Sequence, residues 1–327
     1  MNIEISRSNY VCKALAITCV AAAHCASSDF NAIQLVLTLF GTLGVPVFLI
    51  LSGYTLNTDC SAVEFWKKKF KKICIPWILY GVATYCLHIF ADNVHFDLFN
   101  MGKWIFGYGT WLYFVPILLI CFVLFRIFKT NRGIFALIAI SVGAIIAKSF
   151  GILRFDTIIT DYLDPLSWIC YFGLGVLLKQ CDIKKILNAN IYIKVATWLF
   201  TATLGIIYLL VCLPTYWTFF SIPMSLLFFV SIMLMSQKLG KSKFLIQLGS
   251  NTFPIYFLHM QIGINIVKII YKAIPYNSNV LQGILDLIFP VLVVFITFGI
   301  VKLIGVIAKL IKMENYLWIL GITKNNI

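Results

Sequence analysis

Two ionisable side chains mark the first long apolar run of the chain: Lys13 lies immediately before it and His24 within it, and most of the residues between them are small and apolar. Eleven residues at about 100° each return to nearly the same helix face, so His24 should lie about 16 Å further along the helix than Lys13. Ionisable groups at membrane depth are expensive and usually functional. His24 is therefore the main candidate for a functional residue. The alternative is a histidine bonded to a neighbouring helix, with Lys13 as a topological flank.

A basic segment at 65–76 carries five lysines, Lys69 and Lys72 among them, in an expected loop before another apolar run. Such a cluster suits phosphates, on a nucleotide-like cofactor or on anionic lipid head groups. Membrane topology alone is the alternative explanation of these charges.

Two further segments bring polar groups to membrane depth. Pro46 and the pair Ser52-Gly53 interrupt a Leu-rich run, which permits a kink or a close helix approach and places a hydroxyl there. His259 follows Pro254 in a later run. For both segments a packing notch and a catalytic role remain open.

The elements that must position these residues are membrane helices. Of the 327 residues, 61% are hydrophobic and only 12% are charged, against a usual charged share of about 25%. This composition excludes a water-soluble globular protein, and nucleic-acid binding with it, because too little polar surface remains to display the cations. Continuous apolar runs favour helices over a barrel. About ten such runs occur, at 14–30, 35–56, 73–90, 111–128, 134–150, 166–178, 193–213, 218–235, 253–271 and 281–311.

The net charge of +14 is mostly an orientation signal. With the N-terminus on the cytoplasmic side, 21 of the 26 Lys and Arg residues lie on that side. The remaining five lie outside, namely Lys103, Lys148, Arg154, Lys268 and Lys272. The sequence therefore predicts an all-α, multi-pass protein of the plasma (inner) membrane with both termini cytoplasmic. Residues 1–327 are expected to form one transmembrane domain without an appended soluble domain. No metal is expected, since no Cys or His residues have metal-ligand spacing.

In order along the chain, these segments resemble the acyltransferase-3 family of membrane O-acyltransferases. Lys13 and His24 are similar to the family's Arg and His pair, and the run that ends at Ser52, Gly53 and Tyr54 is similar to its second span. The other similar motifs are Lys69 and Lys72 before Pro76, Trp111 and Tyr113, Phe172 to Gly175, and Ser250 to His259. Lysine replaces arginine at position 13, and Tyr10 stands where the family often has Asp. A lysine meets phosphate as a point charge, without the planar fork of a guanidinium.

The resemblance implies an O-acetyltransferase that moves an acyl group, usually acetyl, from acetyl-CoA to a hydroxyl. The acceptor would be a cell-envelope or exopolysaccharide carbohydrate or a lipid-linked glycan. Lys13, Lys69 and Lys72 are the expected sites for the phosphates of the acyl-CoA. His24 is the expected general base, and Ser52 and Tyr113 are the other catalytic candidates. Ser52, Tyr54 or Tyr113 could orient the imidazole, since the first run contains no carboxylate.

A transporter or flippase for a glycan or lipid-linked sugar is the competing interpretation. Such proteins place carboxylates near the midplane on broken helices, often at corresponding positions of two halves. Here the runs hold almost no acid, Asp286 being the main exception, and no half-to-half symmetry is evident.

Overall fold

The computed structural model describes residues 3–26, 31–92, 95–153, 161–181, 188–274 and 279–322. Within these residues the chain is helical and contains no β-strand. The longer helices are α1 (Ile3–Cys25), α2 (Ala32–Tyr54), α4 (Ile75–Asp92), α6 (Phe114–Ile127), α7 (Asn131–Ser149), α8 (Ile169–Gln180), α10 (Ile191–Val211), α11 (Ser221–Leu239) and α15 (Asn279–Leu310). The shorter helices are α3 (Ala62–Lys69), α5 (Leu98–Ile105), α12 (Lys243–Ser250), α13 (Thr252–Leu258) and α14 (Asn265–Lys272). Two π-helical segments, η1 (Phe70–Cys74) and η5 (His259–Ile264), and a 3₁₀ helix, η6 (Glu314–Leu320), complete the parts that matter below.

Each of the ten predicted apolar runs lies on a helix. Among the described residues, six helices are long and apolar enough to cross a membrane, and three further apolar helices are shorter. The six are Ala32–Tyr54, Ala62–Ala91, Asn131–Ser149, Ile191–Val211, Thr252–Lys272 and Leu281–Leu310. The all-α, multi-pass architecture is thereby confirmed, and the number of crossings and the side of each terminus stay predictions. Phe30 and Arg154 lie outside the described residues.

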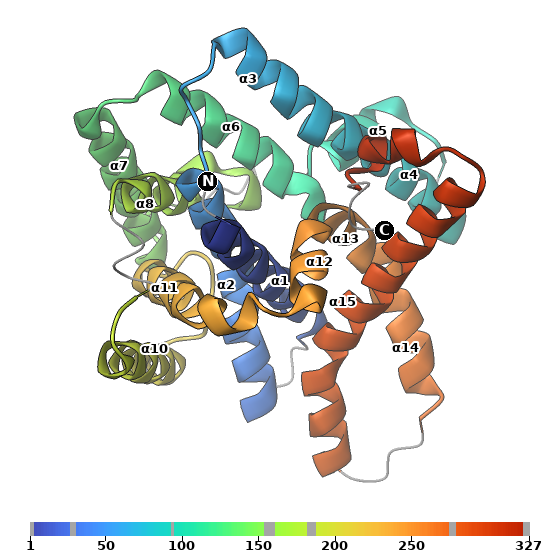
Figure 1. Cartoon of the computed structure of the whole chain (residues 1–327). Coiled ribbons are helices and arrows are strands. Elements are labelled where there is room, and N and C mark those ends of the chain that lie inside the picture. Colours follow the sequence, from blue (N-terminus) through green and yellow to red (C-terminus); the bar gives the residue numbers. More distant parts are fainter. Residues whose placement is uncertain are drawn as a thin grey trace.

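Helix α1 lies at the centre of the molecule, where α2, α11, α12 and α15 pack around it (Figure 1). It begins at Ile3, eleven residues before the predicted run, so Lys13 lies in the middle of the helix and not at its first residue. The small residues of α1 allow α2 to approach closely: a Cβ at Gly44 would stand 2.6 Å from the Val20 amide nitrogen. Because α1 is packed among other helices, it can carry polar residues, although it is not one of the six helices apolar enough to cross a membrane.

The crossing of α2 and α8 is closer still. A Cβ at Gly53 would stand 2.0 Å from the Phe172 carbonyl oxygen, and one at Gly175 would stand 1.9 Å from the Ile50 carbonyl oxygen. The two small-residue motifs therefore fit into each other, as the packing interpretation of Ser52-Gly53 expected.

The basic segment 65–76 is helical, which corrects the expected loop. Its lysines lie on the end of α3 and on the π-helix η1, which continues into α4. Ser61 caps the start of α3 and Lys68 pairs with Glu64 one turn away, so the polar residues stabilise a helix locally.

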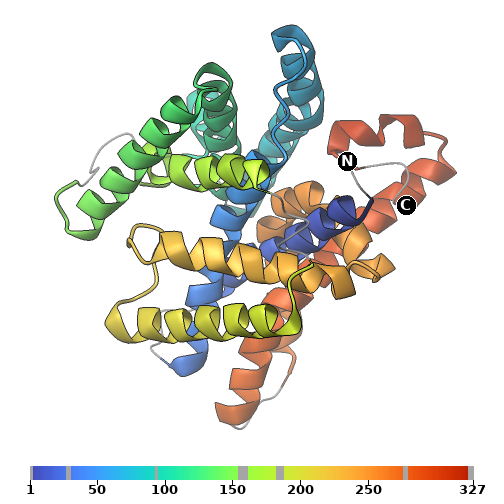
Figure 2. The same cartoon turned by 60° about the vertical axis from the view of Figure 1, so that its left-hand side comes forward.

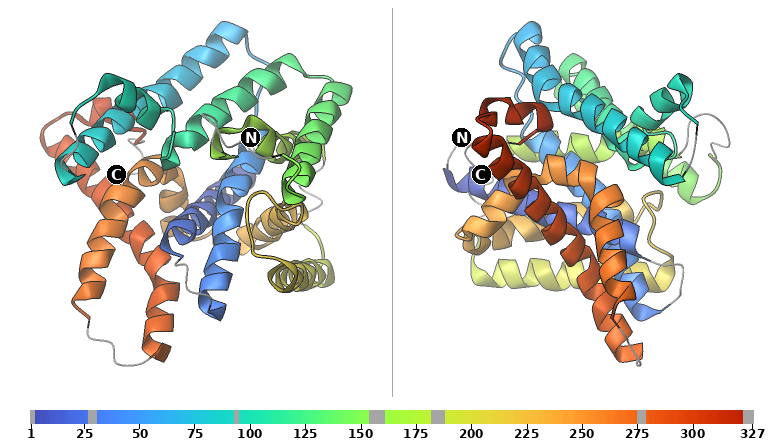
Figure 3. Two further views of the ribbon diagram at one scale, coloured as in Figure 1. Left: turned by 180° about the vertical axis from the view of Figure 1, so that it is seen from behind. Right: turned by 90° about the vertical axis from the view of Figure 1, so that its right-hand side faces the viewer.

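The periphery is built from helix pairs. Helices α10 and α11 pack side by side (Figure 2), and α14 and α15 form a pair that extends beyond the rest of the bundle (Figure 3). The start of α1 and the segment η6 lie close to each other in Figure 2. Lys13 in the middle of α1 and Trp318 of η6 both line the first of the two cavities described next.

Candidate active site

Two neighbouring cavities lie within the helical bundle. The lysine cavity has a volume of 320 Å³ and is lined by Lys13, Ser52, Lys72 and Trp318, among others. The histidine cavity has a volume of 560 Å³ and is lined by His24, Trp111, Tyr113 and Tyr216, among others. Val20, Val45 and Tyr256 line both cavities and form the boundary between them, which we call the neck. The surroundings of Lys13 and those of His24 thus lie on the two sides of this boundary.

The two cavities open among different parts of the chain. Two predicted cytoplasmic cations border the lysine cavity, Lys72 on η1 and Lys13 in the middle of α1. The histidine cavity is bordered by connections predicted to lie outside, at residues 107–111 and 214–216. With the orientation expected from the charges, the cavities belong to opposite faces of the membrane.

His24 ends α1 and its side chain is exposed, although the three preceding turns are largely buried. The ring lines the histidine cavity, so a substrate in that cavity can reach it. The buried environment expected from the sequence therefore applies to the helix and not to the whole imidazole.

A second histidine lies beside His24. The ring centroids of His24 and His259 are 5.3 Å apart and the ring planes are inclined by 48°. His259 is completely buried, and its Nδ1 lies 2.6 Å from the carbonyl oxygen of Tyr256. Nε2 of His259 is a buried atom with no hydrogen-bond partner in the described structure. Sequence reasoning left the role of His259 open, and the only signal was its place in the motif that begins at Ser250.

Tyr113 lies in the same cavity as His24, within an aromatic wall. Its ring packs 5.0 Å from Tyr162 and 5.8 Å from Trp168, centroid to centroid. Tyr216 packs against both Tyr162 and Trp168. Tyr113, Tyr162 and Tyr216 line the cavity, so three phenol rings from separate parts of the chain form one face of it.

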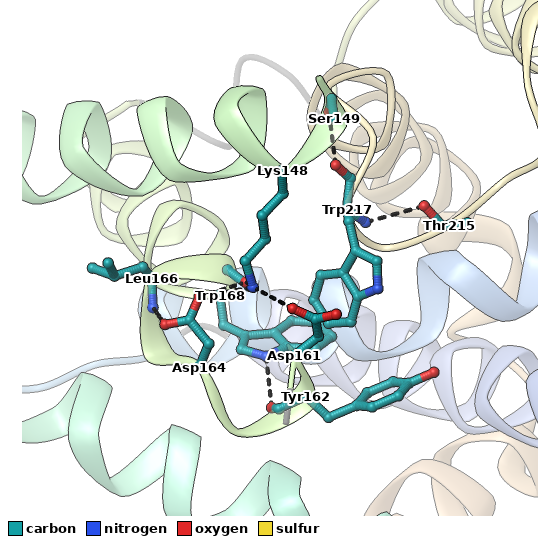
Figure 4. A network of polar contacts seen from close by, with 10 residues as sticks. Lys148, Ser149, Asp161, Tyr162, Asp164, Leu166, Trp168, Thr215 and Trp217 are labelled. Carbon is teal, nitrogen blue, oxygen red and sulfur yellow. Dashed lines mark hydrogen bonds and ion pairs between the residues drawn. The ribbon is translucent and has the colours of Figure 1, made fainter. Parts of the chain in front are cut away.

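An ion cluster behind this wall fixes its backbone (Figure 4). The ammonium of Lys148, whose side chain is 3% exposed, lies 3.0 Å from Asp161 and 2.9 Å from Asp164. Asp164 also accepts the Leu166 amide, which caps a short 3₁₀ turn at Pro165–Ser167. Lys148, which the sequence predicts to lie on the outer side, is thus a structural charge that holds residues 161–168 onto α7.

Two further hydrogen bonds attach the wall to neighbouring elements (Figure 4). The Trp168 indole donates to the Tyr162 carbonyl oxygen at 3.0 Å, and the Ser149 hydroxyl donates to the Trp217 carbonyl oxygen at 2.7 Å. The Lys148 ammonium also lies 5.0 Å from the centre of the Trp217 ring. The aromatic rings are therefore held from behind while the ring of Tyr162 stays 44% exposed.

The three predicted phosphate-binding lysines lie close enough to repel one another, but they are not equivalent. Lys13 and Lys72 line the lysine cavity and repel each other, and Lys69 is repelled by both. Lys69 does not line the cavity, because its ammonium lies over the Phe122 ring, 3.7 Å from the centroid. None of the three pairs with a carboxylate of the described residues. Uncompensated cations gathered at one cavity favour an anionic ligand.

Ser52 lies in the lysine cavity rather than beside His24. Its hydroxyl donates to the Phe48 carbonyl oxygen at 2.7 Å, the local bond that a serine inside a helix often makes. The structure therefore separates the three catalytic candidates, with His24 and Tyr113 in one cavity and Ser52 in the other.

The segment η6 closes part of the lysine cavity. Trp318 and Gly321 line the cavity, and the Lys71 ammonium lies 4.4 Å from the centre of the Trp318 ring. The backbone of Gly321 is left-handed, with φ of 70°, which lets the chain turn sharply after η6. An aromatic ring and a cation thus border the cavity next to Lys72.

Comparison with known proteins identifies the chain. Residues 11–308 match the family model described as an acyltransferase domain. No curated protein and no solved structure matches the chain significantly. The match includes α1 with Lys13 and His24, the basic helix and the segment that carries His259. The chain therefore belongs to the acyltransferase-3 family and is a multi-pass membrane acyltransferase.

Proposed function

We propose that the protein transfers an acyl group, acetyl in the simplest case, from acyl-CoA in the lysine cavity to a carbohydrate hydroxyl in the histidine cavity. The observation that carries the proposal is that the two cavities share Val20, Val45 and Tyr256 as a common boundary. One side of this neck is cationic and the other presents a histidine and aromatic rings. A transfer between two different substrates needs two different binding sites that bring the reacting atoms of the substrates together.

The donor fits the lysine cavity by charge and by side. Coenzyme A is polyanionic and cytoplasmic, and Lys13 and Lys72 offer uncompensated ammonium groups at the cavity. Its phosphates would remain with these lysines while the thinner pantetheine arm follows α1 toward the neck. The walls near the neck are apolar, with Val45, Phe48 and Phe114 among them, which suits an uncharged arm.

The acceptor fits the histidine cavity by shape and chemistry. Tyr113, Tyr162 and Tyr216 offer ring faces and hydroxyl groups, the combination that sugar rings with C–H faces and hydroxyl edges bind well. The volume of 560 Å³ lies within the usual range for small-molecule sites. A cell-envelope carbohydrate or lipid-linked glycan would reach this cavity from the outer face of the plasma membrane.

His24 supplies the general base in this scheme. Its neutral imidazole removes the proton as the acceptor oxygen attacks the thioester carbonyl, and the tetrahedral intermediate collapses with cleavage of the C–S bond. The imidazolium then returns the proton to the departing coenzyme A thiolate. The ester and free coenzyme A leave, and His24 is again neutral.

The test uses the full-length protein in lipid nanodiscs, labelled acetyl-CoA and candidate glycans, with release of free thiol as the readout. His24→Ala should lower kcat by about 10²- to 10⁴-fold, the typical contribution of a positioned base. His95→Ala is the matched control, because His95 is exposed and lines neither cavity. Normal transfer in His24→Ala would refute the assignment of the base. Glycan movement across the bilayer without thiol release would favour the flippase instead.

A further inference from the structure

We infer that His259 is the positioning residue for His24, with its Nε2 accepting a hydrogen bond from the ring N–H of His24. The described structure shows the two rings in contact without this bond; once the His24 ring turns to make it, the bond holds His24 in one tautomer and leaves its other ring nitrogen free to act as the base. The inference rests on the proposed function, in which His24 removes the proton from the acceptor.

The tautomer of His259 follows from its surroundings. A backbone carbonyl oxygen can only accept a hydrogen bond, so the 2.6 Å contact with Tyr256 requires the proton to be on Nδ1 of His259. In the neutral ring Nε2 then carries a lone pair and no proton. This acceptor is buried and has no partner in the described structure, which is rare because a buried unsatisfied polar atom is costly.

The partner of this lone pair must be a donor that touches the His259 ring. The His24 ring lies at 5.3 Å between centroids, nearer than that of Trp111 at 6.5 Å. The Trp111 indole N–H is also a buried donor without a partner, so it is the competing candidate. His24 is favoured because its ring is the closer one and because a base needs a fixed tautomer.

A carboxylate usually orients a catalytic histidine, and none is available here. No Asp or Glu is among the described residues that line the histidine cavity. Asp161 and Asp164, in the segment behind the aromatic wall, are engaged with Lys148. An imidazole acceptor does the same positioning without bringing a negative charge into an apolar surrounding.

The backbone at His259 supports a special role. His259 is the first residue of the π-helix η5, between the α-helices α13 and α14. Single π-helical turns inside helices often occur at functional sites, because the extra residue turns side chains away from the regular register. Here that change coincides with the residue that touches His24.

The experiment measures kcat and both KM values for three replacements in nanodiscs. His259→Gln keeps an acceptor near the position of Nε2, His259→Asn keeps a donor toward Tyr256 and loses the acceptor, and His259→Phe keeps only the ring volume. We expect His259→Asn and His259→Phe to lower kcat by about 10- to 100-fold, as loss of an orienting partner does, with both KM values within about twofold. His259→Gln should recover part of the loss.

A double-mutant cycle separates positioning from packing. If His259 acts only through His24, then His24→Ala combined with His259→Phe should be no slower than His24→Ala alone. Multiplied losses, or full kcat in His259→Asn, would overturn the inference. Trp111→Phe tests the competing donor: an unchanged kcat supports His24 as the partner, and a loss equal to that of His259→Asn overturns it. An inactive wild type would refute the proposed function itself, whereas an active His259→Phe with inactive His24→Ala refutes only the role of His259.

Discussion

The lysine cavity predicts that three neighbouring lysines contribute unequally to coenzyme A binding. Lys13 and Lys72 line the cavity, whereas the Lys69 ammonium lies over Phe122 and outside it. Alanine at position 13 or 72 should remove a charge-assisted hydrogen bond to a phosphate, worth about 1.5 to 3 kcal/mol. At about 1.4 kcal/mol per factor of ten, the dissociation constant should rise about 12- to 150-fold.

Lys69 should act only through its charge. A through-space contribution of the size of an exposed ion pair is about 0.2 to 1 kcal/mol, so Lys69→Ala should raise the dissociation constant by at most about fivefold. Lys68→Ala is the matched control, because Lys68 lies on the same helix, is 62% exposed and pairs with Glu64. Its dissociation constant should stay unchanged.

The assay is isothermal titration calorimetry with free coenzyme A and the full chain in detergent at 0.15 M salt. Lys13→Arg should bind within about threefold of the wild type, because the ammonium is replaced by another cation that donates hydrogen bonds. An equal loss in all four alanine variants would mean that a general positive field binds the ligand. Wild-type affinity in both Lys13→Ala and Lys72→Ala would refute the cavity as the donor site.

Two further predictions concern stability, measured as the midpoint of thermal unfolding in detergent. Lys148→Met should destabilise the protein by about 3 to 5 kcal/mol because it leaves Asp164 buried without its cation, whereas Lys148→Arg should retain most of the stability and the exposed Lys103→Met should stay within about 0.5 kcal/mol. A mild effect of Lys148→Met would mean that the ion cluster does not hold the aromatic wall. Gly175→Ala should destabilise by about 1 to 3 kcal/mol or more because its Cβ meets the backbone of α2, and the control Gly143→Ala, which meets no neighbour within 4 Å, should be neutral or slightly stabilising. Equal unfolding midpoints for these two glycine variants would contradict the close crossing of α2 and α8.

The apolar runs were sufficient to predict the helices because membrane helices must satisfy their backbone internally. The runs do not predict the start of α1, because the residues before Ala14 are helical but not uniformly apolar. Neighbouring helices pack against this part of α1. The polarity of the lysines at 65–76 predicts a loop, and this prediction is wrong. A capped helix with an exposed face tolerates these charges.

The candidate site shows a different limit. Spacing within one helix indicates that Lys13 and His24 share a face, and the structure places each of them in one of two neighbouring cavities. No spacing could indicate that His259 touches His24, because that contact depends on how α1 packs against η5. The position of Ser52 was equally inaccessible, since its hydroxyl bonds its own helix instead of reaching the histidine.

The neck at Val20, Val45 and Tyr256 separates the lysine cavity from the histidine cavity. The neck consists of two apolar side chains and one phenol ring, which disfavour a continuous file of water, as hydrophobic constrictions do in channels. In the proposed reaction only the small, uncharged acyl group passes the neck, and the nucleotide of coenzyme A stays in the lysine cavity. By this proposed reaction the cell would acylate carbohydrates on its outer face with acyl groups made in the cytoplasm, while both the proton gradient and the coenzyme A pool are retained.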